Sequence, residues 1–300
     1  MRHVPVAEAV YEPPVEVEVR ALGDSLEETT LATPLGVLRQ VVQHHSGTSR
    51  FLEHFIKTPD DLPAFEMAQE CLRFRARYED FILIDREIGA RGLAVATAPA
   101  TPLARMHEEY MGLEKTIYAL VDEPEAMERT MDAIHRASLR ELEVVAGSPT
   151  PAVFSYEDTS TTTTISKEMY RRYCMPALDE YKAICEARGL RYIVHMCGKL
   201  KGFKDLIAQT RMDGIDSICP PGSGDVELWE AREYWPGKLL IGGIEPASLA
   251  LMGEEALSRK IWTLLERTDG MDGLILSTGD AVPNGTPVRN LETVSKILGR

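Results

Sequence analysis

The sequence predicts an α/β fold built on a (β/α)8 barrel, because short β-rich runs alternate with amphipathic helical stretches from about residue 90 onward. Six runs have the length and composition of strands, and their spacing is typical of βα units around a parallel sheet. An open doubly wound sheet fits the same spacing, since periodicity alone does not say whether the sheet closes. No glycine-rich dinucleotide fingerprint follows any of these runs, which favours the barrel.

The amino-terminal region has a different pattern, in which Val15–Val19 alternates as a half-exposed strand and Leu31–Val42 predicts the second strand of a hairpin. The six later strands are predicted at Leu93–Thr97, Ala152–Ser155, Tyr192–His195, Gly214–Ile218, Leu239–Gly242 and Gly273–Ser277. Helical patterns lie near residues 103–111, 124–146, 167–188, 200–210, 226–234, 254–267 and 288–298. We expect a single domain over residues 1–300, with a hairpin region at 1–50 and clear βα units at about 90–300.

The charge composition excludes several classes of partner. The chain has 33 Lys plus Arg against 47 Asp plus Glu, a formal net charge of −14, so its general field repels nucleic acid and anionic membrane surfaces. An anionic substrate would therefore need a local cluster to hold it.

The cysteines and the hydropathy pattern predict a location in the cytoplasm. Five cysteines are scattered along the chain, which does not resemble a disulfide framework and favours a reducing compartment. No apolar run approaches the roughly 18 residues of a membrane span, and the first residues do not begin a signal peptide. We expect a cytoplasmic protein that binds neither nucleic acid nor membrane.

The residues that follow the predicted strands are the candidates for chemistry, because a parallel barrel places its site at the carboxyl ends of its strands. Each of them is by type a metal ligand or a proton carrier. In chain order they are Glu157, Asp158, His195, Cys197, Cys219, Glu245 and Asp280.

Four of these residues form the sharpest hypothesis, a single Zn²⁺ site. His195, Cys197, Cys219 and Asp280 supply imidazole, thiolate and carboxylate, the ligand types that zinc takes at about 2.0–2.3 Å. Structural explanations remain open for each residue: a half-buried histidine with satisfied hydrogen bonds, two inert buried cysteines, and an aspartate in an Asx-type turn.

The other strand-end residues have weaker signals. Glu157 and Asp158 are candidate catalytic groups, as proton donor and substrate holder, although adjacent carboxylates in a polar loop are often only solvated. Lys199 and Glu245 are candidate binding residues for a cofactor or an anionic group, and a solvated lysine is the simpler interpretation of Lys199.

Three segments of the chain resemble the uroporphyrinogen decarboxylase superfamily. They run from Tyr156-Glu157-Asp158 to His195-Met196-Cys197-Gly198-Lys199-Leu200, from Gly242 to Pro246, and from Ile275-Leu276-Ser277-Thr278-Gly279-Asp280 to Pro287. The resemblance covers about residues 30–300 and implies a (β/α)8 barrel, in agreement with the strand pattern. The region before the barrel is shorter than is usual in this superfamily.

The motifs are closer to the zinc-dependent methyltransferase branch of that superfamily than to its true decarboxylases. The decarboxylases carry an early Arg-Gln-Ala-Gly-Arg motif, which this chain lacks. The methyltransferases carry His-x-Cys, matched here by His195 and Cys197, and a later cysteine, where this chain has Asp280. Cobalamin-independent methionine synthase has His-x-Cys, then a glutamate and a final cysteine, spaced much like His195, Cys197, Cys219 and Asp280 here. By this analogy the carboxylate and the last cysteine have exchanged places in this chain.

The resemblance implies a methyltransferase that moves a methyl group between a corrinoid carried by a partner protein and a thiol or tetrahydrofolate. It also implies Zn²⁺ as cofactor and a possible homodimer. Two alternatives stay open: a metal-free decarboxylase of a tetrapyrrole or a smaller acid, with Asp158 or Asp280 as acid, and a non-catalytic barrel that binds a tetrapyrrole or a metal.

Overall fold

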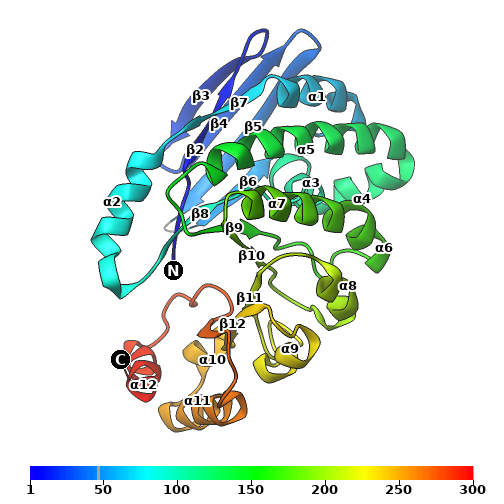
Figure 1. The fold of residues 1–300 in the computed structure, drawn as a ribbon. Coiled ribbons are helices and arrows are strands. Elements are labelled where there is room, and N and C mark those ends of the chain that lie inside the picture. Colours follow the sequence, from blue (N-terminus) through cyan, green and yellow to red (C-terminus); the bar gives the residue numbers. More distant parts are fainter. Residues whose placement is uncertain (46–47, 300) are drawn as a thin grey trace. The chain divides into compact units, whose positions relative to one another are not determined.

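The computed structural model describes residues 1–45 and 48–299, and the chain divides into two compact units, Met1–Val153 and Phe154–Arg300. Figure 1 colours the first from blue to green and the second from green to red. The single domain that the sequence predicts stays a prediction.

The first unit contains two small antiparallel sheets and the first strands of a parallel one. Its strands are β1 (Arg2–Val4), β2 (Ala7–Tyr11), β3 (Glu16–Gly23), β4 (Leu26–Thr33), β5 (Gly36–His45), β6 (Thr48–Glu53), β7 (Leu72–Ala76) and β8 (Ala94–Thr97). Its helices are η1 (Pro59–Asp61), α1 (Leu62–Glu70), α2 (Tyr78–Ile88), η2 (Gly89–Arg91), α3 (Pro102–Arg105), the π-helical η3 (Met106–Tyr110), α4 (Leu113–Asp122) and α5 (Pro124–Ala146). Strands β3, β4, β5 and β6 form one antiparallel sheet in that order, β2 pairs with β7, and β1 lies parallel to β8.

The prediction of antiparallel strands in this region is confirmed, but the predicted bounds of the second strand are wrong. Leu31–Val42 is divided between β4 and β5, because Pro34 and Leu35 form a turn there. The Thr33 hydroxyl stabilises this turn by accepting from the Leu35 N–H and donating to the Gly36 carbonyl. The hydrophobic pattern continues across these two residues, so the periodicity of the sequence does not show the turn.

The second unit contains five parallel strands, of which the first is β9 (Ala152–Tyr156). The order then runs β10 (Arg191–His195), β11 (Gly214–Ile218), β12 (Leu239–Ile244) and β13 (Leu274–Thr278). Its helices are α6 (Lys167–Met169), the π-helical η4 (Tyr170–Cys174), α7 (Met175–Ala187), η5 (Lys201–Phe203), α8 (Lys204–Gln209), α9 (Leu228–Tyr234), α10 (Pro246–Leu251), α11 (Glu254–Thr268) and α12 (Val288–Ile297).

The fold class is the predicted (β/α)8 type, with the extra antiparallel strands at the amino terminus. Seven strands of the parallel sheet lie in the described residues, and the six predicted strands are all among them. The additional one, β1, has only three residues, too few for a periodic pattern. No helix among residues 1–45 and 48–299 has the length and apolar character needed to cross a bilayer.

The helical patterns predicted near residues 167–188 and 226–234 agree with the structure to different degrees. Ser166 caps α6 by accepting from the Met169 N–H, at the start of the first pattern. In the second, α9 begins at Leu228, and the Asp225 carboxylate ahead of it accepts from the N–H groups of Leu200 and Lys201. Asp225 thus anchors the chain after β10.

A buried ion pair ties α7 to the start of β11. The Lys182 ammonium donates to Asp213 at 2.8 Å, and the same carboxylate accepts from the Tyr192 N–H at 2.8 Å and from Arg191 at 3.1 Å. Burial raises the pKa of Asp213, but these hydrogen bonds outweigh it and hold that pKa below its ordinary value.

The two cations on Asp213 provide a matched pair of variants. The Lys182 side chain is only 9% exposed and that of Arg191 is 74% exposed. We expect Lys182→Met to lower the free energy of unfolding by about 2–3 kcal/mol, because a buried charge loses its partner. Arg191→Met should cost less than about 1 kcal/mol, since an exposed pair contributes little.

The effect of Lys182→Met should depend on pH with a defined sign. A depressed carboxyl pKa stabilises the fold above the unfolded pKa of about 3.9, and this contribution is lost as the pH falls through the folded value. Urea unfolding at pH 7 and below pH 4 measures both quantities. Equal losses for the two variants at pH 7 would contradict the assignment.

Candidate functional site

Three potential metal ligands meet at the carboxyl ends of β9 and β10. His195 is the last residue of β10, Cys197 follows two residues later, and Asp158 comes two residues after β9. One ligand atom from each lies within 4.8 Å of the other two. The His195 Nε2 is 3.3 Å from the Asp158 carboxylate, and the Cys197 Sγ is 3.8 Å from the same oxygen. His195 is buried, Cys197 half-buried and Asp158 exposed, so the cluster opens to solvent on the side of Asp158.

The backbone explains why Asp158 reaches His195. The Glu157 N–H donates to the His195 carbonyl oxygen at 2.8 Å, so the pairing between the two chain segments continues one residue past β9. Asp158 lies in a turn that the Ser160 N–H closes on the Glu157 carbonyl oxygen at 3.0 Å, so the chain changes direction between the two carboxylates. The adjacent carboxylates therefore have different environments.

Asp216 orients His195 and was not among the residues predicted from the sequence. Its carboxylate lies 2.5 Å from the His195 Nδ1, and the two residues are direct partners in the register of β10 and β11. Its signal in the sequence is a carboxylate in the middle of an apolar strand. With Nδ1 bonded to Asp216, the Nε2 faces Asp158.

The strand that carries Asp216 is irregular at this point. The pairing of β11 with β12 shifts register between Ile215 and Ile218, and Ser217 has a φ of 75°, in the left-handed region. A non-glycine residue there costs on the order of 1 kcal/mol or more, and such strain is concentrated at functional sites. β-Bulges redirect side chains beside active sites in the same way.

Charges and burial set the protonation of the cluster. Burial lowers the pKa of His195, but the hydrogen bond and charge of Asp216, with the charges of Asp158 and Asp280, outweigh it and raise that pKa. The Asp158 side chain is 47% exposed, and the desolvation of its covered part raises its pKa, an effect that the nearby His195 reduces without cancelling. Burial and the Asp158 charge raise the pKa of the Cys197 thiol to about 12.

The two other predicted zinc ligands lie outside the group of three. Cys219 is buried just after β11 and packs so closely against Gly279 that a side chain at position 279 would collide with its sulfur. Asp280 is exposed, and its carboxylate accepts from the Ala281 N–H at 2.6 Å. The Asp280 charge nevertheless raises the pKa values of Asp158, Cys197 and Cys219, which places it within electrostatic reach. The four-ligand site thus stays a prediction.

The remaining predicted residues have identifiable contacts. Glu157 is fully buried and accepts a hydrogen bond from the Ser160 hydroxyl at 2.9 Å. Glu245 is buried and caps α10, accepting from the Ser248 N–H at 2.7 Å. Lys199 is exposed, and its backbone carbonyl accepts from Thr162. Binding roles for Glu245 and Lys199, and a catalytic role for Glu157, remain predictions.

The chemistry of the cluster follows from its atoms. Imidazole, thiolate and carboxylate form a zinc-type ligand set, and three protein ligands leave a position for a substrate, as in catalytic zinc sites. Without a cation, the same groups could hold and move a proton between Asp158 and His195.

Comparison with known families identifies the fold and the family. The model of the family described as uroporphyrinogen decarboxylase (URO-D) matches residues 29–299, nearly the whole chain. The chain belongs to the uroporphyrinogen decarboxylase family. A search of curated proteins finds no match.

Solved structures similar to this uroporphyrinogen decarboxylase family member include a methyltransferase from Methanosarcina mazei. It has 13% sequence identity and a TM-score of 0.60, over 85% of this chain and 73% of that one. A protein described as a vitamin-B12-independent methionine synthase from Listeria monocytogenes has 16% identity and a TM-score of 0.43, over 76% of this chain and 72% of its own. At these identities the first likeness shows the fold, and the second carries no argument.

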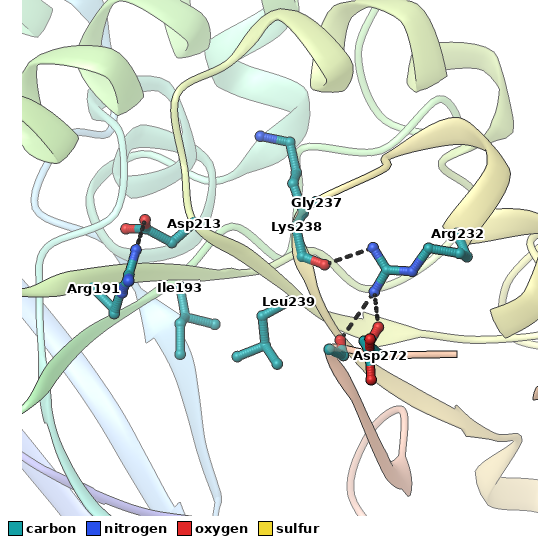
Figure 2. Close-up of a pocket in the computed structure, with 9 residues that line it drawn as sticks. Arg191, Ile193, Asp213, Arg232, Gly237, Lys238, Leu239 and Asp272 are labelled. Carbon is teal, nitrogen blue, oxygen red and sulfur yellow. Dashed lines mark hydrogen bonds and ion pairs between the residues drawn. The ribbon is translucent and has the colours of Figure 1, made fainter. Parts of the chain in front are cut away.

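A pocket of about 500 Å³ lies at the opposite, amino ends of β10 to β13 in this family member (Figure 2). Arg191 binds Asp213 there, and Arg232 donates to four backbone carbonyl oxygens, those of Trp235, Lys238, Asp272 and Gly273. The Lys238 ammonium donates to two more carbonyl oxygens, those of Thr210 and Met212. These cations bind the protein itself, as expected for the stability face of a barrel.

The raised pKa of Cys197 predicts slow alkylation of the metal-free protein. A thiol with a pKa of about 12 has little thiolate at neutral pH, so its rate with iodoacetamide should rise about tenfold per pH unit from pH 7 to 10. Asp158→Asn removes a charge that raises this pKa and should increase the rate at pH 8. Peptide mass spectrometry after chelation follows the site, and a plateau below pH 9 would refute the prediction.

Proposed function

We propose that this chain is a zinc-dependent methyltransferase of the uroporphyrinogen decarboxylase family, which moves a methyl group between a corrinoid protein and a thiol or tetrahydrofolate. The observation that carries the proposal is the convergence of Asp158, His195 and Cys197 at the carboxyl ends of two neighbouring strands. The shared fold with a protein described as a methyltransferase supports it at the level of architecture.

The residues of the cluster fit a zinc ion by donor type and by orientation. Asp158, His195 and Cys197 would hold it, and Asp216 keeps the imidazole in the orientation that directs Nε2 toward the cluster. A bound zinc ion lowers the pKa of a thiol that it coordinates, so that a thiolate exists at neutral pH.

The chain's own groups would define the substrate's surroundings. Where Cys219 or Asp280 takes the place of Asp158 on the ion, Asp158, exposed at the opening, would position the substrate or move a proton, while the buried Glu157 holds the loop through its hydrogen bond from Ser160. Cys219 and Asp280 would line the same rim or complete the ligand set. Lys199, exposed after Cys197, and Glu245 would contact an anionic group of the substrate or corrinoid.

One observation favours a second candidate, a metal-free decarboxylase. Burial raises the pKa of Asp158, which keeps a proton on this carboxyl closer to neutral pH than on an ordinary aspartate. Asp158 would then deliver the proton that replaces the carboxylate of a small acid. Full activity after exhaustive chelation would favour this function over the methyltransferase.

Metal content tests the proposal directly. We expect protein purified without a histidine tag to contain about one zinc per chain by mass spectrometry, and Cys197→Ala and His195→Ala to lose it. Cys71→Ala, a half-buried cysteine outside the cluster, is the matched control and should retain the metal. Loss in Cys219→Ala or Asp280→Ala would add that residue to the ligand set, and stoichiometric zinc in Cys197→Ala would refute the site.

The orienting role of Asp216 predicts a graded effect on affinity. Asp216→Asn should weaken zinc binding by roughly 10–100-fold, because carboxylates that orient a ligating histidine have effects of this size. Competition with a chromophoric chelator measures the change. Asp205→Asn, an exposed aspartate on α8, should leave the affinity unchanged. An affinity of Asp216→Asn equal to that of the wild type would show that His195 needs no such orientation.

A further inference from the structure

Two loops of the second unit carry two of the candidate ligands, and these loops touch one another. Residues 158–165, between β9 and α6, carry Asp158, and residues 196–202, after β10, carry Cys197. The Cys197 Sγ lies 3.7 Å from the Asp158 carbonyl oxygen and 3.8 Å from its carboxylate. Because both loops lie beyond the strands, contacts between the loops contribute to the distance between the two ligands.

Thr162 joins the first loop to the second through two hydrogen bonds to one atom. Its N–H and its hydroxyl both donate to the Lys199 carbonyl oxygen, each at 3.0 Å. Thr162 follows Asp158 by four residues, and Lys199 follows Cys197 by two. The two bonds therefore connect the loops within a few residues of both ligands.

Two glycines of the second loop leave room for threonines of the first. A Cβ at Gly202 would lie 2.6 Å from the Thr162 Cγ2, and one at Gly198 would lie 3.3 Å from the Thr161 Cγ2. Gly198 has a φ of 91°, which favours glycine for the backbone alone. The φ of Gly202 is outside the left-handed region, so the Thr162 methyl group is what excludes a larger side chain there.

The second loop is also anchored to a third segment. The Asp225 carboxylate accepts from the Leu200 N–H at 2.8 Å and from the Lys201 N–H at 3.0 Å. With the Lys199 carbonyl bonded to Thr162, three consecutive residues have backbone groups held by hydrogen bonds. The loop thus has little slack with which to absorb a displacement beside Gly202.

We propose that Thr162 is a positioning residue of the candidate metal site, because it joins the loop of Cys197 to the loop of Asp158; this inference rests on the proposed function. Thr162 acts through the Lys199 backbone and not by binding the ion. Both branches of its side chain are used, the hydroxyl on Lys199 and the methyl group against Gly202. Rotation about χ1 to relieve a collision at Gly202 therefore removes the hydrogen bond to Lys199.

Gly202→Ala and Thr162→Ser form a compensating pair of variants. The methyl group added by Gly202→Ala meets the Thr162 Cγ2, so either the loops separate or Thr162 turns away from Lys199. We expect the zinc affinity, measured by chelator competition, to fall about threefold to tenfold, the size of one lost hydrogen bond. Thr162→Ser keeps the hydroxyl without the methyl group, and the double variant should return to within about twofold of the wild type.

Hydrogen exchange of the metal-free protein measures the junction of the loops without zinc. We expect Gly202→Ala to speed exchange in residues 158–165 and 196–202, and the double variant to restore the wild-type rates. Gly253→Ala is the matched control and should change neither exchange nor zinc affinity, because a Cβ there meets no atom within 4 Å and the φ is −71°. Circular dichroism verifies that each variant folds.

The two readouts separate this inference from the proposed function. Wild-type protein that binds no zinc would contradict the proposed function, while the exchange rates still decide whether Thr162 joins the loops. Exchange in Gly202→Ala equal to that of the wild type would overturn the inference in either case. So would faster exchange with unchanged zinc affinity, or losses that Thr162→Ser fails to reverse.

Discussion

The candidate site depends on one hydrogen bond, between the His195 Nδ1 and the Asp216 carboxylate across two parallel strands. It holds the imidazole with Nε2 toward Asp158, and the Glu157 N–H bond to the His195 carbonyl delivers Asp158 to that side of the ring. Cys197 lies two residues after His195, and its sulfur is 3.8 Å from the same carboxylate oxygen. The orientation of this ring thus places its Nε2 beside the other two candidate ligands.

The electrostatics of the cluster explain why a cation suits it. Burial holds the Cys197 thiol and the Asp158 carboxyl in their protonated forms more strongly than water would, and each negative neighbour adds to the effect. A positive charge among these groups reverses the balance, because it stabilises thiolate and carboxylate together. The raised pKa of His195 shows the same preference for positive charge.

The two ends of β10 to β13 are built differently. At the amino ends, Arg232 and Lys238 donate to backbone carbonyl oxygens and fasten loops to strands. At the carboxyl ends, imidazole, thiol and carboxylate face one another, and Ser217 keeps a left-handed backbone beside them. Stability is concentrated at one end and reactive groups at the other, as is general for barrels of this type.

The sequence by itself determined the six main strands, the barrel class, and the position of Asp158, His195 and Cys197 at strand ends, since these follow from local periodicity and chain order. The sequence could not show which of Glu157 and Asp158 faces His195, because this depends on how the loop pairs with β10. Nor could it find Asp216, whose role arises from the register of two strands and a bulge against a third. Such positions are set by neighbours distant in sequence, and only the tertiary structure decides which of them meet.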